Sequence, residues 1–572
     1  MDILLYNTKA YIEAGRFAEA VLVSGDRITE VGRSDELLAK VAPGCEVIDC
    51  GGRVLVPGFN DSHMHLMEFG EGRRQAPVAE AGSVSELVEI CRRFAEEHPE
   101  LVRNGMHAAG WNQDGFSDHR IPNRKDLDRI STKFPVVLER VCGHICAVNS
   151  RAVEMLGLTA DSPQPADGRF GTFPEGEPDG VFYGGACLLV RKLIPEFTDE
   201  ERLDILEDAM KYAASRGVTS VQSNDVGAMS GTASDNFTLF RRLYEEGRGC
   251  IRFRHQVNFE SPEDFRECLA HGEYAHAKEF YPEGSLLTLG PLKLYKDGSL
   301  GARTALMKHG YPDAPDQHGL EWYSDEEMMD FCRLAAEHGI QTVTHCIGDA
   351  ATAQTAECYI RCNRDVLGTE GNPLRNALVH CQFTDEDTLS KITRHDLLAM
   401  VQPVFLHADI PLIGELVDQG LAATSYAFRT ILTGRGCPDN TDRIPLSLGT
   451  DCPVEDLDPF QNIYCAVTRR QLPGDPAETV QRFTATGGSV LCGAYTPAEC
   501  LTVSQAVDAY TAGSAYAMFM EDRLGRISPG YLADLVLLDK DIFTCDPEGL
   551  LRTDPVLTMV DGRIVFQKTG TF

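Results

Sequence analysis

The 572-residue sequence lacks the features that would place it at a membrane. No apolar run is long enough to span a bilayer. The first residues, MDILLYNTKAYIEAG, lack the positively charged segment followed by an apolar one that marks a secretory signal. We therefore expect a cytoplasmic protein without a membrane partner.

Positive charge is also scarce. Lys and Arg number 53 against 86 Asp and Glu, which gives a formal net charge of −33. Nucleic acids and anionic lipids bind basic surfaces, so this balance argues against both as partners. The phosphate-binding motif G-x-x-x-x-G-K-[ST] is absent as well, and no nucleotide is expected.

The nineteen cysteines are scattered and include no C-x-x-C pair, which suits reduced thiols in a cytoplasmic protein. Hydrophobic residues make up 43% of the chain and charged residues 24%, so there is ample material for a folded core. The length exceeds what one core usually supports, and two or more structural units are expected.

The two ends of the chain resemble each other. Residues 1–57 and 521–572 consist of short runs rich in β-branched residues, separated by turns. The triplets Gly-Asp-Arg at 25–27 and Asp-Gly-Arg at 561–563 predict hairpin turns. Neither end can bury a sheet by itself, so we expect both to form one small β-domain, with the rest of the chain inserted between them.

The middle of the chain, 58–520, alternates strand-like runs with helical ones. The helical pattern is clearest at 325–339, an amphipathic stretch that ends in Gly. Eight strands are expected: one leads into His63, and the others lie at 218–223, 252–259, 286–298, 341–349, 376–383, 397–403 and 445–453. Eight strands alternating with helices predict an α/β fold with a parallel barrel. The long gap after the first strand predicts an inserted subdomain at about 70–200.

Residues that can bind a metal occur where these strands end. His63 and His65 share one face of an extended strand, and neutral imidazoles are common zinc ligands. His345, His380 and Asp451 close three later strands. Active sites of such barrels lie at the carboxyl ends of the strands, so these positions predict one shared metal site.

Each of these residues also has a simpler interpretation. His345 or His380 alone could be a hydrogen-bonded core histidine, and Asp451 alone could cap the segment that follows it. Lys293 is unusual, because a lysine within an apolar strand is rarely buried unless it is paired or modified. It could join a metal site as a neutral amine, or as a carbamate whose two oxygens bridge two metal ions.

The ordered motifs resemble the amidohydrolase superfamily, and within it the YtcJ-like branch that includes N-substituted formamide deformylases. The motifs are VPGFNDSHMH, GWNQDG, PVVLERVCGHICAVNS, LKLYKDGSLGARTA, THCIGDAA, ALVHCQF, GTDCPV and GRISPGYLADLVLLD. The resemblance implies a distorted (β/α)8 TIM barrel with a β-sandwich domain built from both termini. It also implies a metal site, usually zinc, and homodimers are common among the resembling proteins.

The resemblance also implies roles for the candidate ligands. His63, His65 and Asp451 would hold a buried metal ion, and His345 and His380 a second one. Carboxylated Lys293 would bridge the two ions. Lys296, three residues later on the opposite face of an ideal strand, is the alternative if a bulge intervenes. Residues of the loop after this strand could shape the site: Asp297, Gly298 and Arg303.

The implied mechanism uses a metal-bound hydroxide that attacks a carbonyl carbon. Asp451 would accept the proton of the nucleophile and deliver it to the leaving nitrogen. His144 could donate a hydrogen bond to the developing oxyanion, and Trp111 could form an apolar wall for the substrate. For both residues, packing within the insertion is the alternative interpretation.

The leading hypothesis is a metal-dependent hydrolase of non-peptide C–N bonds, such as those of N-substituted formamides. The alternatives are a mononuclear deaminase or an ester or lactone hydrolase on the same scaffold. A metal-binding protein without catalysis would predict a broken ligand set, yet every expected ligand is present. The ligand types admit Zn, Mn, Fe or Ni, with two zinc ions as the first choice.

Overall fold

The computed structural model describes residues 2–141, 143–165, 167–193, 196–434, 445–473 and 495–570. The chain divides into two compact units. Unit 1 comprises Met1–Glu68 and Leu206–Phe572, and unit 2 comprises Phe69–Ile205. The second unit covers the segment for which the sequence predicts an insertion. Among the described helices, none has the length and apolar character needed to cross a bilayer.

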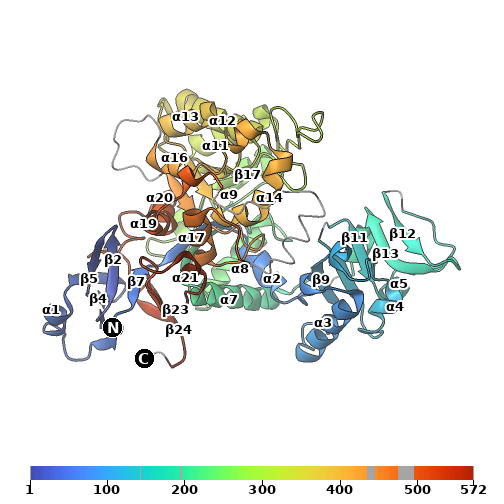
Figure 1. Ribbon diagram of the computed structural model, residues 1–572, viewed down its shortest axis with the longest axis horizontal. Helices are drawn as coiled ribbons and strands as arrows, with labels where there is room; N and C mark the ends of the chain where they lie inside the picture. The colour runs from blue at the N-terminus through green and yellow to red at the C-terminus, as the bar shows by residue number, and fades with distance from the viewer. Residues whose placement is uncertain are drawn as a thin grey trace. The chain divides into compact units, whose positions relative to one another are not determined.

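Both ends of the chain contribute to one β-structure in unit 1 (Figure 1). A six-stranded sheet has the order β24-β23-β22-β7-β2-β3, with β24 Arg563–Gln567, β23 Pro555–Val560, β22 Leu535–Leu538, β7 Val54–Pro57, β2 Lys9–Glu13 and β3 Arg16–Ala18. A four-stranded sheet has the order β5-β4-β1-β6, with β5 Arg27–Gly32, β4 Ala20–Ser24, β1 Asp2–Tyr6 and β6 Glu46–Asp49. Strands β7 and β22 pair antiparallel, with Val56 opposite Val536, so the two termini share one sheet.

The two hairpin turns predicted from the end segments are confirmed. Gly25 lies between β4 and β5 with φ +61°, and Asp561 and Gly562 lie between β23 and β24 with φ +53° and +73°. The turns also meet each other, since a Cβ on Gly562 would lie 1.8 Å from the carbonyl oxygen of Gly25. A glycine is therefore required at 562 both for the turn and for this close approach.

Two parallel sheets form the rest of unit 1. The first has the order β16-β15-β14-β8, with β16 Leu287–Thr288, β15 Arg252–His255, β14 Val218–Ser223 and β8 Phe59–Met64. The second has the order β17-β18-β19-β20-β21, with β17 Leu292–Tyr295, β18 Thr342–Cys346, β19 Ala377–His380, β20 Leu398–Val401 and β21 Leu446–Leu448. The prediction of a single strand at 286–298 is wrong, because Gly290 and Pro291 separate β16 from β17.

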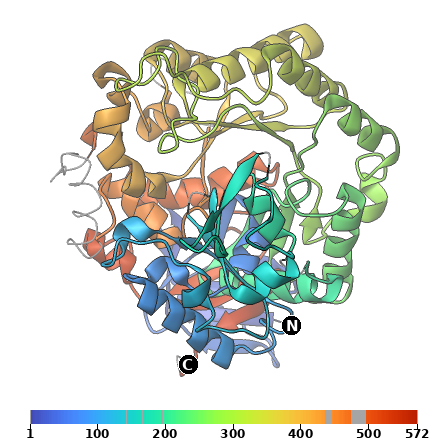
Figure 2. The same cartoon turned by 90° about the vertical axis from the view of Figure 1, so that its right-hand side faces the viewer.

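The two parallel sheets adjoin at both edges. At one edge the Lys293 amide donates to the Val257 carbonyl at 2.7 Å, and at the other the Asp451 amide donates to the His63 carbonyl at 2.9 Å. In Figure 2 the helices from green to orange lie outside the strands. They include α8 Ala233–Glu245, α9 Pro262–His271, α11 Asp325–Glu337, α12 Asp349–Leu367, α13 Glu386–Arg394, α14 Leu406–Leu416 and α17 Pro459–Thr468.

Helix α11 shows how the sequence positions these elements. Ser324 caps its first turn, and Glu327 bonds back to the Ser324 amide in a reciprocal capping box. The apolar face, which includes Phe331 and Ala335, is buried. Gly339, with φ +67°, follows the helix and precedes β18, as the amphipathic pattern at 325–339 predicts.

Unit 2 has a five-stranded sheet of its own. Its order is β12-β13-β11-β10-β9, with β12 Gly168–Thr172, β13 Pro178–Gly184, β11 Ile145–Val148, β10 Val136–Arg140 and β9 Met106–Trp111. Its helices include α3 Val84–Glu97, α4 Arg124–Leu127, α5 Ser150–Met155 and α6 Cys187–Arg191. Two buried apolar clusters fill this unit, one around Trp111 and Leu138 and the other around Phe170 and Phe182.

Candidate metal centre

Strand ends of unit 1 bring the six predicted ligands to one place. His63 is the penultimate residue of strand β8, and His65 directly follows the end of that strand. His345 is the penultimate residue of β18, and His380 is the last residue of β19. The register pairs Tyr295 with His345 and Cys346 with His380, so the neighbouring strands end at similar levels. The six residues are His63, His65, Lys293, His345, His380 and Asp451.

Short distances connect these side chains. The Nε2 atoms of His63 and His65 each lie 3.3 Å from Asp451 Oδ1, and His380 Nε2 lies 4.0 Å from Asp451 Oδ2. The imidazole rings of His345 and His380 are 4.4 Å apart between centroids. His63, His380 and Asp451 offer ligand atoms that all lie within 4.8 Å of one another, which is the spacing of a set that could hold a metal ion.

Three of the four histidines are in the neutral form that binds a metal. Burial lowers the pKa of His345 to about 3 and takes the pKa values of His63 and His380 well below the ordinary value. All three imidazoles are therefore neutral at pH 7, as coordination requires. Burial acts on His65 in the same sense, but the hydrogen bond and charge of Asp451 outweigh it and raise the pKa of His65.

The residues present fit a bound cation. His380 Nε2 is buried and has no hydrogen-bond partner among the described residues, and the buried Asp451 Oδ1 faces the imidazole nitrogens of His63 and His65. Such orphaned polar atoms cost free energy unless something satisfies them. Imidazole nitrogens and a carboxylate oxygen are suitable ligands for zinc and similar divalent ions.

The structure also separates Lys293 from Lys296. Both side chains are fully buried. The charge of Lys293 acts on His63, His345 and His380, and its Nζ lies 3.6 Å from the centre of the Tyr295 ring. The Nζ of Lys296 instead bonds to acceptors away from the histidines: Glu321 at 2.7 Å, the Tyr323 carbonyl at 2.8 Å and Asp325 at 2.9 Å.

Burial changes the acid–base character of Lys293. It lowers the pKa of this amine from 10.5 to about 7, against the opposing charge of Asp451. A substantial fraction of Lys293 is therefore a neutral amine near pH 7. This is the nucleophilic form of a lysine.

Two buried aspartates support the ligands. Asp61 accepts hydrogen bonds from the Thr450 hydroxyl at 2.7 Å and from the Tyr510 hydroxyl at 3.1 Å, which ties β8 to the segment that carries Asp451. Asp297 accepts the backbone N–H groups of Ile347 and Gly348, in the loop after His345. The sequence did not single out Asp61, although it lies within the NDSHMH motif.

Each of the four histidines donates a hydrogen bond from one ring N–H group to an oxygen. His63 Nδ1 lies 2.6 Å from Gln256 Oε1, and His380 Nδ1 lies 2.7 Å from Gln402 Oε1. His65 Nδ1 lies 3.0 Å from the Asn224 carbonyl, and His345 Nε2 lies 3.1 Å from the Gly298 carbonyl. Sequence analysis missed both glutamines, although each follows directly after a strand, where the ligands themselves are found.

The two site residues predicted within the insertion belong to unit 2. His144 precedes β11, and its carbonyl accepts a hydrogen bond from the Gly184 amide at 2.9 Å. Its expected role as an oxyanion donor stays a prediction. Trp111 is fully buried and packs 6.3 Å from Phe116 between ring centroids. This packing agrees with the alternative interpretation of Trp111, and its expected role as an apolar wall for the substrate stays a prediction.

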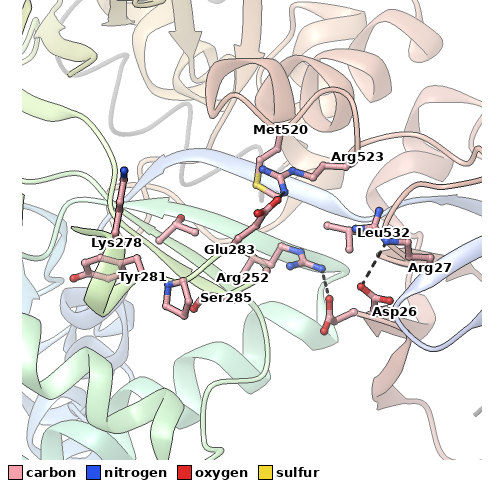
Figure 3. A pocket seen from close by; sticks show the side chains of 14 residues that line it. Asp26, Arg27, Arg252, Lys278, Tyr281, Glu283, Ser285, Met520, Arg523 and Leu532 are labelled. Carbon is pink, nitrogen blue, oxygen red and sulfur yellow. Dashed lines mark hydrogen bonds and ion pairs between the residues drawn. The ribbon is translucent and has the colours of Figure 1, made fainter. Parts of the chain in front are cut away.

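A cavity of about 450 Å³ lies elsewhere in unit 1 (Figure 3). Arg252, which begins strand β15, lines this cavity, whereas the candidate metal centre lies where the strands end. The guanidinium of Arg252 is already bonded to Asp534 at 2.8 Å and to Asp561 at 2.8 Å. Because both carboxylates already pair with this guanidinium, at the opposite end of the strand from the candidate metal centre, we interpret these contacts as structural.

Comparison with known proteins identifies the family. The sequence profile of the Amidohydrolase family matches residues 46–566, which is most of the chain. The chain belongs to the amidohydrolase family. This amidohydrolase is therefore a hydrolase of carbon–nitrogen bonds from a metal-dependent superfamily, as the motifs indicated.

Relatives of this amidohydrolase match over nearly their full lengths. YtcJ of Bacillus subtilis (strain 168), described as an amidohydrolase, is 28% identical and covers 98% of each chain. The N-substituted formamide deformylase of Arthrobacter pascens is 25% identical over 100% of this chain and 99% of its own. A solved metal-dependent hydrolase from Pyrococcus furiosus is 26% identical with a TM-score of 0.72, covering 95% of this chain and 100% of that one.

Proposed function

We propose that this amidohydrolase cleaves small amides, N-substituted formamides first among them, with two divalent metal ions bridged by carboxylated Lys293. The observation that carries the proposal is the convergence of Lys293 with four histidines and Asp451 at adjoining strand ends. The similarity to the N-substituted formamide deformylase of Arthrobacter pascens supports this choice of substrate. We also propose that the two parallel sheets form one distorted (β/α)8 barrel, and that the sheets from both termini form a β-sandwich.

The environment of Lys293 favours carboxylation. In this reaction the neutral amine attacks CO₂, a new N–C bond forms, and one proton leaves. The pKa of about 7 that burial gives Lys293 makes the neutral amine available. The product is an anion in place of a cation, so it would complement the metal ions that four histidines and one aspartate leave positively charged.

The residues of the chain would have two roles, binding the ions and transferring a proton. His63, His65 and Asp451 would hold one ion, His345 and His380 the other. When bound, two zinc ions supply a water nucleophile at neutral pH and polarise the scissile carbonyl. Asp451 would accept a proton from the attacking water at its carboxylate and pass that proton to the leaving nitrogen, which an amide needs before it can depart.

Metal content tests the proposal. We expect about two zinc ions per chain by elemental analysis of protein purified without chelator. Lys293→Ala should retain one ion or fewer and should lose hydrolysis of N-substituted formamides by at least about 10²-fold, because the bridge and one ion are lost. Lys296→Ala is the matched control: it removes an equally buried lysine, lowers stability, and should leave the metal content unchanged.

Two outcomes would contradict the proposal. One ion per chain with no dependence on Lys293 would favour the mononuclear alternative and deamination. Protein that takes up no zinc after reconstitution would exclude the metal mechanism altogether.

A further inference from the structure

Two glutamines contact the candidate metal centre in the same way. Gln256 follows strand β15 and bonds to His63, while Gln402 follows strand β20 and bonds to His380. Both side chains are 2% exposed or less. They come from different parallel sheets, and each serves a different one of the two proposed ions. This repeated arrangement is not explained by packing alone.

The orientation of each carboxamide is fixed by its own nitrogen. Gln256 Nε2 donates to the Ser62 carbonyl at 2.9 Å, and Gln402 Nε2 donates to the Met400 carbonyl at 3.3 Å. The oxygens therefore face the histidines. A carboxamide oxygen can only accept a hydrogen bond, so the Nδ1 atoms of His63 and His380 must carry the protons. Their Nε2 atoms are then unprotonated, and each carries a lone pair on the side of Asp451.

Asn224 braces the first glutamine. Its side-chain nitrogen donates to the Gln256 carbonyl at 2.8 Å, and its own carbonyl lies 3.0 Å from His65 Nδ1. Tyr295 lies two residues after Lys293, and its hydroxyl donates a hydrogen bond to Asn224 Oδ1 at 2.5 Å. One buried hydrogen-bonded chain thus joins His63, His65 and the strand that carries Lys293.

We propose that Gln256 and Gln402 are positioning residues that hold His63 and His380 in the tautomer and direction needed to bind metal. The inference rests on the proposed function, since it requires the centre to bind zinc. Groups that orient metal-binding histidines typically change metal affinity by 10- to 100-fold when they are removed. Both glutamines act through the histidines and need not touch the substrate.

The experiment measures zinc affinity of the apoprotein by competition with a chromogenic chelator, so no substrate is required. Gln256→Met and Gln402→Met keep the side-chain length and remove the acceptor. We expect zinc binding to weaken about 10- to 100-fold in each. Gln341→Met is the matched control, because Gln341 is an equally buried glutamine that bonds to Arg254 and backbone carbonyls. Its zinc affinity should stay within about twofold of the parent.

A second variant separates positioning from simple stability. Gln256→Glu keeps an acceptor for His63 Nδ1 but loses the donor to Ser62, so it should melt at a lower temperature than the parent. Positioning predicts that it nevertheless binds zinc more tightly than Gln256→Met. If zinc affinity instead follows melting temperature across the series, or if both Met variants bind zinc as the parent does, the inference is wrong. A parent protein that binds no zinc would overturn the proposed function itself.

Discussion

His255 is a buried histidine without a polar partner among the described residues. It is fully buried, and neither ring nitrogen has a hydrogen bond. The rings of Phe237, Phe240 and Phe253 surround it at 5.0 to 5.1 Å between centroids. Because its neighbour Gln256 faces His63 in the candidate metal centre, His255 faces the opposite side of the strand. Burial lowers its pKa from 6.5 to about 3.

This environment predicts a pH dependence of stability. Between pH 6.5 and pH 3 the unfolded chain binds a proton at His255 and the folded chain does not. The free energy of unfolding should therefore fall as the pH decreases through this window, by up to about 1.4 kcal/mol per pH unit. Denaturant unfolding at several pH values should show a smaller loss for His255→Phe than for the parent. Equal slopes for the two proteins would contradict this account.

At the scale of elements, two hairpin turns from opposite ends of the chain support each other. Gly562 has φ +73° and leaves no room for a Cβ beside the Gly25 carbonyl. Gly562→Ala should lower the free energy of unfolding by at least about 1 kcal/mol, since it adds both backbone strain and a clash. Gly570→Ala is the control: its φ is +78°, but no atom lies within 4 Å of its Cβ position. A loss no larger at 562 than at 570 would exclude the contact as its cause.

Sequence patterns located these elements unevenly. The run at 218–223 coincides with strand β14, and the turn triplets coincide with the two hairpins. Strand-like runs and glycines with positive φ could be recognised because both are local features of the sequence. The division of 286–298 was missed because it depends on tertiary contact: a Cβ on Gly290 would lie 1.9 Å from the His255 carbonyl.

The candidate site could be predicted as far as chemistry is unambiguous. Histidines, an aspartate and a lysine at strand ends have few roles, so the sequence is enough to predict that they belong together. The structure places all six of these residues close to one another. A glutamine at a strand end has many roles. Gln256 and Gln402 become meaningful only when the three-dimensional contacts place their oxygens on imidazole nitrogens.

At the scale of the whole molecule, the net charge of −33 makes the folded chain repel itself. Added salt screens this repulsion, and the screening length shrinks from about 30 Å at 0.01 M to about 8 Å at 0.15 M. We expect the melting temperature to rise by about 1–3 °C over this range of sodium chloride. Tetramethylammonium chloride at the same ionic strength should have the same effect. A melting temperature that falls with both salts would show that attractive ion pairs dominate.

The two units carry one tryptophan each, and these are the only two in the chain. Trp111 of unit 2 is fully buried, whereas Trp322 of unit 1 is 63% exposed and lies 5.8 Å from the Tyr295 ring between centroids. The intrinsic fluorescence should therefore separate into a short-wavelength emission that acrylamide does not quench and a long-wavelength emission that it does. Trp322→Phe should leave only the first. In the parent protein the short-wavelength emission would then report the unfolding of unit 2. The long-wavelength emission would independently report structural changes near Tyr295 and Lys293, without any added label.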